Sequence, residues 1–248
     1  MNIFLFFITF ATYILFWDIL LHTLMAINRK LALKVINKKD SNIARMLFAL
    51  AGKYVSFQLE KDLRLQKVLP KQFMIISNHQ SIIDIAAIFY SFPENKPRFV
   101  AKRELAKGVP MISAILQAEK HAIINREKDF SKTMKELHRL ATMADEGICP
   151  VIFPEGTRSK DGTLGDFHVG AVRKVLETRP MPVVSVALDG GYRLSHLKDF
   201  TNNIKKAIYR IKIMSLYEPV QGKKEINSML QKIHEELDSQ LKEWHSIN

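Results

Sequence analysis

Residues 73–84 have the sequence FMIISNHQSIID, and this stretch decides the fold class. Its first half, Phe73 to Ser77, is an apolar run with the length of a buried strand, and polar groups follow at once. Residues 150–159, PVIFPEGTRS, have the same arrangement, with an apolar run from Pro150 to Phe153. Open α/β sheets bind ligands at the carboxyl ends of their strands. The two stretches therefore predict an α/β fold with a functional site at one edge of the sheet.

Strands and helices alternate along the rest of the chain, as they do in α/β proteins. The predicted strands are Tyr54–Leu59, Gln72–Ser77, Arg98–Ala101, Ala122–Asn125, Pro150–Phe153, Pro182–Leu188 and Ala207–Leu216. The predicted helices are Asn28–Gly52, Ile82–Ser91, Val109–Gln117, Phe130–Asp145, Val169–Thr178 and Lys223–Trp244. This pattern predicts a mostly parallel sheet flanked by helices in residues 53–248. A membrane-associated helical hairpin is predicted in residues 1–52.

The composition favours an anionic partner. The 248 residues include 37 basic and 25 acidic ones, a formal net charge of +12. Such a charge suits an anionic membrane surface or a phosphorylated substrate. The basic residues do not interleave with aromatic ones, so nucleic acid is not a predicted partner. Cys149 is the single cysteine, which excludes an intrachain disulfide and fits a buried thiol in a reducing compartment.

The first 27 residues predict a membrane anchor. Asn2 to Trp17 carries no charge, and Ile19 to Ile27 continues the apolar run after Asp18. At about 1.5 Å per residue, a helix of this length could cross the ~30 Å hydrocarbon core. A signal peptide and a buried core helix are the alternatives. No Lys or Arg precedes the run and no small-x-small cleavage site follows it, which favours the anchor.

Charged residues in and after this run indicate its orientation. Five basic residues follow it closely: Arg29, Lys30, Lys34, Lys38 and Lys39. By the positive-inside rule they predict that this flank and the catalytic domain are cytoplasmic, unless they form only a solvated face. Asp18 and His22 lie four residues apart and suit a tilted or re-entrant segment. In the following helix, Ile43, Met46, Leu47 and Leu50 are predicted to form the apolar side.

His79 and Asp84 are the candidate catalytic pair. Positions five apart on a continuous helix lie about 140° around the axis, so the pair can meet only if His79 is on the loop before the helix. Ser81 is a candidate N-cap, and Ser81-x-x-Asp84 is similar to a capping box. Asp84 then either caps the helix or orients the imidazole. In the second case the other ring nitrogen can take a proton from a substrate hydroxyl.

The second stretch is the candidate anion site. Gly156 allows a sharp turn, and Arg158 can bind a phosphate with two parallel hydrogen bonds. Glu155 is expected to hold Arg158 or a substrate hydroxyl, although an ordinary turn with a surface ion pair would have the same pattern. Arg126 ends a predicted strand at the same edge of the sheet. The chain has no Gly-x-Ser-x-Gly elbow, so the substrate is expected to supply the nucleophilic oxygen.

These residues resemble the glycerolipid acyltransferase family, most closely its bacterial 1-acyl-sn-glycerol-3-phosphate acyltransferases. Residues 78–84 match the family's Asn-His-x-Ser-x-x-Asp block, and residues 153–159 match its Phe-Pro-Glu-Gly-Thr-Arg-Ser block. Gly170-Ala171 follows at the usual distance. The block Gly-x-x-Phe-Ile-x-Arg is matched only at Ile124 and Arg126, since Lys120 and Ile123 depart from it. A fourth block keeps Pro182 but has Ser185 in place of a second proline.

The resemblance implies transfer of a fatty acyl group from acyl-CoA or acyl carrier protein to the free hydroxyl of 1-acyl-sn-glycerol 3-phosphate (lysophosphatidate), giving phosphatidic acid. His79 would be the base and Asp84 its orienting carboxylate. The implied substrate-binding residues are Glu155, Gly156, Thr157, Arg158 and Arg126. Backbone N–H groups near Gly156 or at the start of the Ser81 helix would stabilise the oxyanion. No metal and no resident cofactor are expected. The implied location is a phospholipid membrane surface, with the catalytic domain on the cytoplasmic face of a bacterial inner membrane.

Three alternatives remain from the sequence. The acceptor could be glycerol 3-phosphate or another lysophospholipid. The chain could also be a membrane lipid-binding protein without turnover, although binding alone does not need the His79–Asp84 pair. An anchored phosphatase or esterase would need a nucleophile or metal site that the sequence does not indicate.

Overall fold

A computed structural model describes residues 3–124, 129–194 and 203–246. Its centre is a seven-stranded sheet in the order β1-β7-β6-β2-β5-β3-β4. The strands are β1 Gln58–Asp62, β2 Met74–Ser77, β3 Lys96–Lys102, β4 Ala122–Ile124, β5 Ile148–Ile152, β6 Val183–Asp189 and β7 Ile208–Tyr217. Only the β6–β7 pair is antiparallel among these neighbours. The predicted mostly parallel sheet is confirmed.

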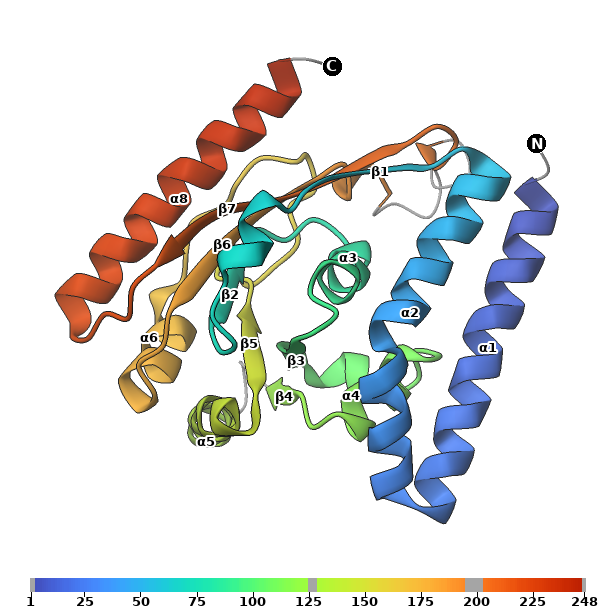
Figure 1. Ribbon diagram of the computed structural model, residues 1–248, viewed down its shortest axis with the longest axis horizontal. Coiled ribbons are helices and arrows are strands. Elements are labelled where there is room, and N and C mark those ends of the chain that lie inside the picture. Colours follow the sequence, from blue (N-terminus) through green and yellow to red (C-terminus); the bar gives the residue numbers. More distant parts are fainter. Residues whose placement is uncertain (1–2, 125–128, 195–202, 247–248) are drawn as a thin grey trace.

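Helices cover both faces of the sheet (Figure 1). The α-helices are α1 Ile3–Ile27, α2 Arg29–Val55, α3 Ile83–Ser91, α4 Ile112–Ala118, α5 Phe130–Thr142, α6 Val169–Thr178 and α8 Lys223–Ser246. Short 3₁₀ segments are Arg64–Val68, Arg103–Ala106, Met143–Glu146 and Tyr192–Leu194. Helices α1 to α4 lie on one side, and α5, α6 and α8 lie on the other.

The alternating side chains of the central strand build the two cores. In β2, Ile75 packs with the core beneath α2 and α3, whereas Met74 and Ile76 pack with the core beneath α5, α6 and α8. All four residues of β2 are buried, as expected for a strand covered on both faces. The α8 side of the second core is the predicted stripe, in which Ile226 and Leu230 are buried. Polar loops therefore leave the sheet at the carboxyl ends of the strands, between the two cores.

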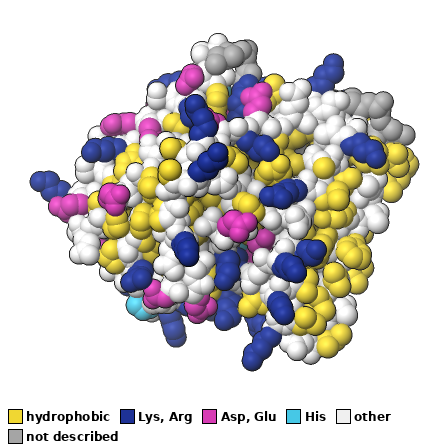
Figure 2. Space-filling model, viewed as in Figure 1, with side chains coloured by type: hydrophobic (Ala, Val, Ile, Leu, Met, Phe, Trp, Pro, Cys, Tyr) yellow, Lys and Arg dark blue, Asp and Glu magenta, His cyan; other side chains and the backbone are white. Residues whose placement is uncertain are grey.

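Helix α1 is part of the fold and also carries a large apolar surface. It lies beside α2 and buries Phe6 and Leu21. The Met111 N–H donates to Asp18 Oδ1 at 2.7 Å, which explains the charged residue in an apolar helix. The outward side chains are Phe4, Leu5, Ile8, Leu15, Phe16, Ile19 and Ile27, all exposed. Within the described residues, α1 is the one helix long and apolar enough to cross a membrane. Figure 2 shows hydrophobic side chains gathered along this edge of the molecule.

Three local predictions were wrong. Helix α2 continues to Val55, past the predicted end at Gly52, and the next strand begins only at Gln58. The buried stripe of α2 runs through Asp40 and Ile43, so Met46 is exposed. Helix α4 starts later than predicted, at Ile112. In each case packing between distant parts of the chain overrides the local pattern. The predicted division into residues 1–52 and 53–248 stays a prediction.

Candidate active site

The two motif loops leave neighbouring strands and are held together by backbone hydrogen bonds. Ile76 of β2 pairs with Ile152 of β5, so both loops begin at the same edge. The His79 N–H donates to Glu155 Oε1 at 2.7 Å, and the Ser159 N–H donates to the His79 carbonyl at 2.8 Å. Both backbone groups of His79 are therefore fixed by the second motif.

Asn78 fixes the first loop to the strand on its other side. Its Nδ2 donates to the Leu188 carbonyl, and its Oδ1 accepts from the Leu188 N–H, both at 2.8 Å. This paired contact extends the β2–β6 pairing by one residue and starts the loop at a defined point. The asparagine of the first motif therefore supports the position of His79 from the β6 side.

His79 and Asp84 meet as predicted. His79 Nδ1 lies 2.6 Å from Asp84 Oδ2, and the imidazole stacks on the Phe153 ring with centroids 4.2 Å apart. The His79 side chain is 18% exposed, whereas Asp84 is fully buried. Among the described residues His79 Nε2 has no hydrogen-bond partner. The arrangement leaves one nitrogen of an oriented imidazole open to a substrate, which is the geometry of a general base.

Asp84 both orients the imidazole and closes the start of α3. Its Oδ2 also accepts from the backbone N–H groups of Gln80 at 2.6 Å and Ser81 at 2.8 Å. The two functions left open by the sequence are thus combined in one carboxylate. The Ser81 N-cap prediction was wrong, since α3 begins at Ile83 and the Ser81 hydroxyl accepts only a 3.4 Å contact from the Ile83 N–H. The Asp84 carboxylate, and not the Ser81 hydroxyl, accepts the hydrogen bonds from the backbone N–H groups of Gln80 and Ser81 just before α3.

Glu155 has a different partner from the two considered for it. Its oxygens accept from the backbone N–H groups of His79 at 2.7 Å and Gly165 at 2.9 Å, and the residue is buried. Burial raises the pKa of this carboxyl, and the two N–H donors act in the opposite direction. Glu155 therefore braces the histidine loop and does not pair with Arg158.

The remaining predicted ligands lie on the outer part of the second loop. Gly156 has φ +70°, a backbone conformation that favours glycine. Thr157 and Arg158 are exposed, and no described carboxylate forms an ion pair with Arg158. Arg126 lies outside the described residues. The structure therefore places an unpaired guanidinium on the loop that holds His79.

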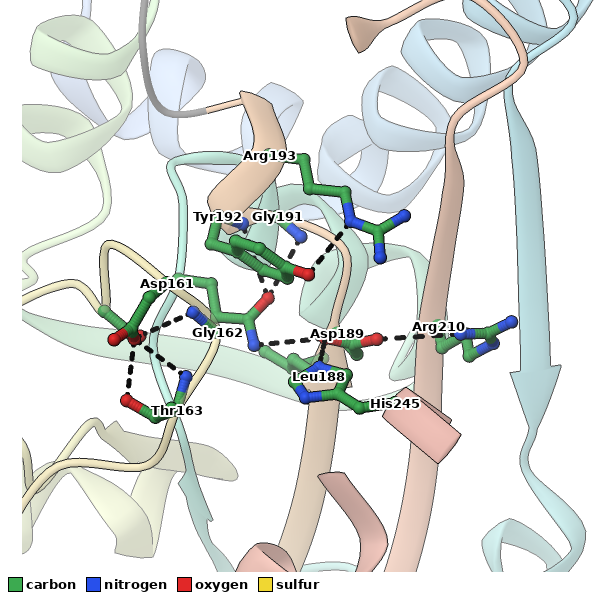
Figure 3. A network of polar contacts seen from close by, with 12 residues as sticks. Asp161, Gly162, Thr163, Leu188, Asp189, Gly191, Tyr192, Arg193, Arg210 and His245 are labelled. Atoms are coloured by element: carbon green, nitrogen blue, oxygen red, sulfur yellow. Dashed lines mark hydrogen bonds and ion pairs between the residues drawn. The ribbon is translucent and has the colours of Figure 1, made fainter. Parts of the chain in front are cut away.

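A polar network behind the histidine loop was not predicted (Figure 3). Gln80 Oε1 accepts from the Gly191 N–H at 3.0 Å, and Gln80 Nε2 donates to Asp189 Oδ1 at 3.3 Å. Asp189 lies between His245 Nε2 at 3.0 Å and Arg210 Nη1 at 3.6 Å. The network thus ties the loop to the end of β6 and to the last turn of α8.

Close packing at Gly191 keeps this network against the Asp84 carboxylate. A Cβ at Gly191 would lie 2.9 Å from Ser81 Cβ and 3.1 Å from Asp84 Oδ1. Such contacts are too short for a side chain, so the backbone can approach Asp84 this closely only at a glycine. No sequence pattern signalled this contact.

Tyr209 was also missed. Its hydroxyl donates to Asp84 Oδ1 at 2.7 Å, and its side chain is fully buried. Tyr209 lies near the start of β7, which reaches the site edge because β7 runs antiparallel to β6. The chain between Leu194 and the start of β7 lacks a predicted helix, and parallel crossovers usually contain one. That signal could have indicated the antiparallel strand.

An apolar cavity of about 270 Å³ adjoins the histidine loop on the α1–α4 side. Ser81 and Ile82 line it next to the site, and α1, α2, α3 and α4 supply most of the remaining wall with residues such as Phe10 and Ile115. Asp40 and His121 are its titratable lining groups among the described residues. The cavity can accommodate an apolar chain next to Ser81 and Ile82 of the histidine loop.

Comparison with known proteins places the chain in a family. The family model described as Acyltransferase matches residues 60–189. A coconut (Cocos nucifera) 1-acyl-sn-glycerol-3-phosphate acyltransferase is 32% identical over 117 residues, 46% of this chain and 36% of that protein. The human 1-acyl-sn-glycerol-3-phosphate acyltransferase beta is 32% identical over 151 residues, 60% of this chain and 50% of that protein. The chain thus spans half or less of the length of these curated relatives.

A solved structure has the same fold. The 1-acyl-sn-glycerophosphate acyltransferase PlsC from Thermotoga maritima superposes with a TM-score of 0.69 over 97% of this chain and 94% of that one, at 21% sequence identity. This likeness includes the N-terminal helices as well as the sheet. Because the family model also covers more than half of the sequence and includes both motifs, the chain belongs to the glycerolipid acyltransferase family.

Proposed function

We propose that the protein transfers a fatty acyl group from acyl-CoA or acyl carrier protein to the free hydroxyl of 1-acyl-sn-glycerol 3-phosphate. The observation that carries this proposal is the buried Asp84 carboxylate 2.6 Å from His79 Nδ1, with Nε2 unbonded by any described residue and Arg158 on the adjoining loop. A general base and a phosphate ligand side by side suit a phosphorylated acceptor alcohol. The names of the relatives support the same acceptor.

The proposed reaction begins when His79 Nε2 takes the proton of the acceptor hydroxyl. The oxygen attacks the thioester carbonyl, the C–S bond breaks as the tetrahedral intermediate collapses, and the imidazolium returns the proton to the leaving thiolate. Asp84 stabilises the imidazolium while Phe153 holds the plane of the ring. General-base assistance of this kind contributes about 10²–10⁴ in rate. No resident cofactor or metal is required in this scheme, since the acyl donor is a co-substrate.

The hydrogen bonds of the two loops narrow the choice of oxyanion donors. Asp84 already accepts the Ser81 N–H, and the Gly156 N–H donates to the Phe153 carbonyl at 3.1 Å. The backbone N–H groups of Thr157 and Arg158 have no partner among the described residues. These two groups are therefore our candidates for stabilising the oxyanion.

The apolar features support a substrate delivered from a membrane. The exposed side chains of α1 suit burial in lipid, and the cavity of about 270 Å³ between α1–α4 and the histidine loop suits an acyl chain. The hydrogen bond from the Met111 N–H to Asp18 holds α1 against the rest of the protein. This arrangement suits a helix that lies in one leaflet of the bilayer. The basic residues after α1 would place the site at the cytoplasmic surface.

The test is a direct assay on the full chain. Purified protein is incubated with lysophosphatidate-containing vesicles and either acyl-CoA or acyl carrier protein, and the products are identified by mass spectrometry. Formation of phosphatidic acid, faster than acylation of glycerol 3-phosphate or lysophosphatidylcholine, is the expected result. Preferential acylation of another acceptor would replace the proposed substrate, and the absence of any acyl transfer would refute the proposal.

The phosphate-binding function of Arg158 has its own test. Arg158→Lys keeps the charge and loses the paired donors, so we expect a KM for lysophosphatidate about tenfold higher and a nearly unchanged kcat. Arg64→Lys is the control, because Arg64 is exposed and pairs with Asp62 on the outer strand β1. Equal losses by Arg158→Lys toward lysophosphatidate and a phosphate-free monoacylglycerol would contradict phosphate binding.

A further inference from the structure

The catalytic carboxylate is held from both of its oxygens. Asp84 Oδ2 accepts from the His79 imidazole and from two backbone N–H groups, whereas Oδ1 accepts from the Tyr209 hydroxyl at 2.7 Å. Tyr209 is fully buried in β7, on the opposite side of Asp84 from His79. The Tyr209 hydroxyl therefore helps to fix the rotation of the Asp84 carboxylate. Without it, only the hydrogen bonds to Oδ2 would set that rotation.

A buried carboxylate needs such donors to remain ionised. Asp84 has no exposed surface, so hydrogen bonds and not water must solvate its carboxylate. Burial, together with the nearby Asp84 charge, raises the pKa of Tyr209 well above its usual value, so the phenol stays protonated. Tyr209 is thus a donor to Asp84 at every pH at which an imidazole titrates.

We propose that Tyr209 is a positioning residue for the acyl transfer, acting through Asp84 on His79. This inference rests on the proposed function, because it assigns a partner to the base of that reaction. The hydroxyl orients the carboxylate so that Oδ2 faces His79 Nδ1, and it shares the negative charge of Asp84. Tyr209 lies outside both sequence motifs.

The hydrogen bond from Tyr209 to the charged Asp84 determines the direction in which the pKa of His79 should change when the hydroxyl is removed. A hydrogen bond from Tyr209 is strongest when Asp84 has the full negative charge, which is the state with neutral His79. Removing the hydroxyl therefore disfavours neutral His79 relative to the imidazolium, and the pKa of His79 rises. The other charged groups near this cluster are Glu155, bound to the His79 N–H, and Asp189, which pairs with His245 and Arg210 and does not contact Asp84. The variant leaves all of them in place.

The test compares two tyrosines that differ in their partner. Tyr209→Phe removes the Asp84 hydrogen bond, and Tyr90→Phe removes a hydroxyl that accepts from Lys61 Nζ at 2.8 Å. Both rings pack near Phe48, with centroids 6.3 and 5.8 Å away, so Tyr90→Phe removes a hydroxyl from the same aromatic cluster at a half-buried position that does not contact Asp84. Thermal unfolding, kcat, KM and the pH dependence of kcat/KM are measured for each variant.

For Tyr209→Phe we expect kcat to fall about tenfold, KM for lysophosphatidate to stay within about twofold, and the acid limb of the kcat/KM profile to move to higher pH. Tyr90→Phe should leave all three unchanged. The pKa of the His79 imidazole, followed by NMR with His79→Gln for assignment, should rise in Tyr209→Phe. This last reading does not need turnover, so it tests the inference even if the proposed acyl transfer is not observed.

Unchanged kcat and an unchanged His79 pKa in folded Tyr209→Phe would overturn the inference. If that variant does not fold, 3-fluorotyrosine at position 209 keeps the shape of the side chain and makes the phenol a stronger donor. The His79 pKa should then fall relative to the unmodified protein, and no shift would equally overturn the inference.

Discussion

Two histidine–carboxylate pairs lie at opposite ends of one stack of aromatic rings. His79 stacks on Phe153 at 4.2 Å, Phe153 on Phe99 at 6.1 Å, and Phe99 on His121 at 5.7 Å. His79 pairs with Asp84 at 2.6 Å, and His121 pairs with Glu119 at 2.8 Å. The two pairs thus share ring packing and partner chemistry, and they differ in what surrounds the second ring nitrogen.

His121 has both nitrogens engaged inside the protein. Its Nδ1 accepts from the Phe99 N–H at 2.9 Å, so a neutral ring carries its proton on Nε2, toward Glu119. Burial lowers the pKa of His121, and Arg98 lies 3.4 Å from the same Glu119 oxygen. This second pair is part of a buried network that joins β3 to the start of β4. With both ring nitrogens engaged, the His121 imidazole has none left for a substrate.

The comparison shows that the pairing alone does not make a base. His79 differs because its loop leaves β2 at the carboxyl end of the strand, and no residue in the described part of the chain bonds its Nε2. We therefore expect position at the carboxyl ends of the strands to matter for the proposed function of the first pair, and burial to matter for the stability contributed by the second. Substitutions at the two ends of the stack should therefore separate rate from stability.

The largest expected contrast is between His79→Ala and His121→Ala. His79→Ala should lower kcat by about 10²–10⁴-fold with little change in thermal midpoint, because it removes the proton acceptor. His121→Ala should keep the single-turnover rate of the folded protein and lower the free energy of unfolding by about 1–3 kcal/mol, because it leaves the Phe99 N–H without its acceptor and the Glu119 carboxylate with Arg98 but without the imidazole. Stopped-flow turnover and chemical denaturation measure the two quantities. A His121→Ala protein of normal stability without activity would break the comparison.

The carboxylates give the next contrast. Asp84→Asn should lower kcat by about 10²-fold or more, since an amide cannot stabilise the imidazolium. It should also cost about 1–3 kcal/mol of stability, because its NH₂ group must face donors that now bind a carboxylate. The four donors around Asp84 are the reason for this cost.

Glu119→Gln is the matched variant for the second pair. It should leave kcat within about twofold and destabilise the fold by about 3–5 kcal/mol, because the Arg98 guanidinium loses its buried counter-charge. Single-turnover rates and denaturation curves of Asp84→Asn and Glu119→Gln measure these losses of rate and of stability. A rate loss in Glu119→Gln equal to that of Asp84→Asn would show that the ring stack couples the two pairs in catalysis.

Local patterns predicted the parts of the molecule whose interactions are local. Helix α6 spans Val169–Thr178 as predicted, and the two motif loops leave β2 and β5 as the apolar runs indicated. The His79–Asp84 contact was predictable because both residues lie on one loop and the helix turn that follows it.

The missed parts depend on contacts between distant segments. Tyr209 reaches Asp84 only because β7 runs antiparallel, and Gln80 reaches Asp189 only because β6 lies next to β2. The histidine of the second pair has no motif, since Glu119 and His121 resemble ordinary polar residues between α4 and β4. Their function becomes visible only when Arg98 is placed beside them.

Asp40 gives a test of the buried end of the comparison that depends on pH and changes stability alone. It lies on the buried face of α2 and lines the apolar cavity. Burial, together with the nearby Glu119 charge, raises the pKa of Asp40 to about 7. The folded protein therefore holds this proton more tightly than the unfolded chain. The contribution of Asp40 to the free energy of unfolding is therefore most favourable below pH 4, and it decreases as the pH rises toward 7.

Asp40→Asn should remove that dependence. The change from 3.8 to about 7 corresponds to at most about 4 kcal/mol, at about 1.4 kcal/mol for each pH unit. We expect the variant to match the parent near pH 4 and to exceed its free energy of unfolding by a few kcal/mol at pH 8, because the amide needs no desolvated charge. The Ser41 N–H, which donates to Asp40 Oδ1 at 2.5 Å, keeps an acceptor. Urea denaturation of both proteins at several pH values measures the difference, and a constant difference across pH 4–8 would show that Asp40 does not titrate in this range.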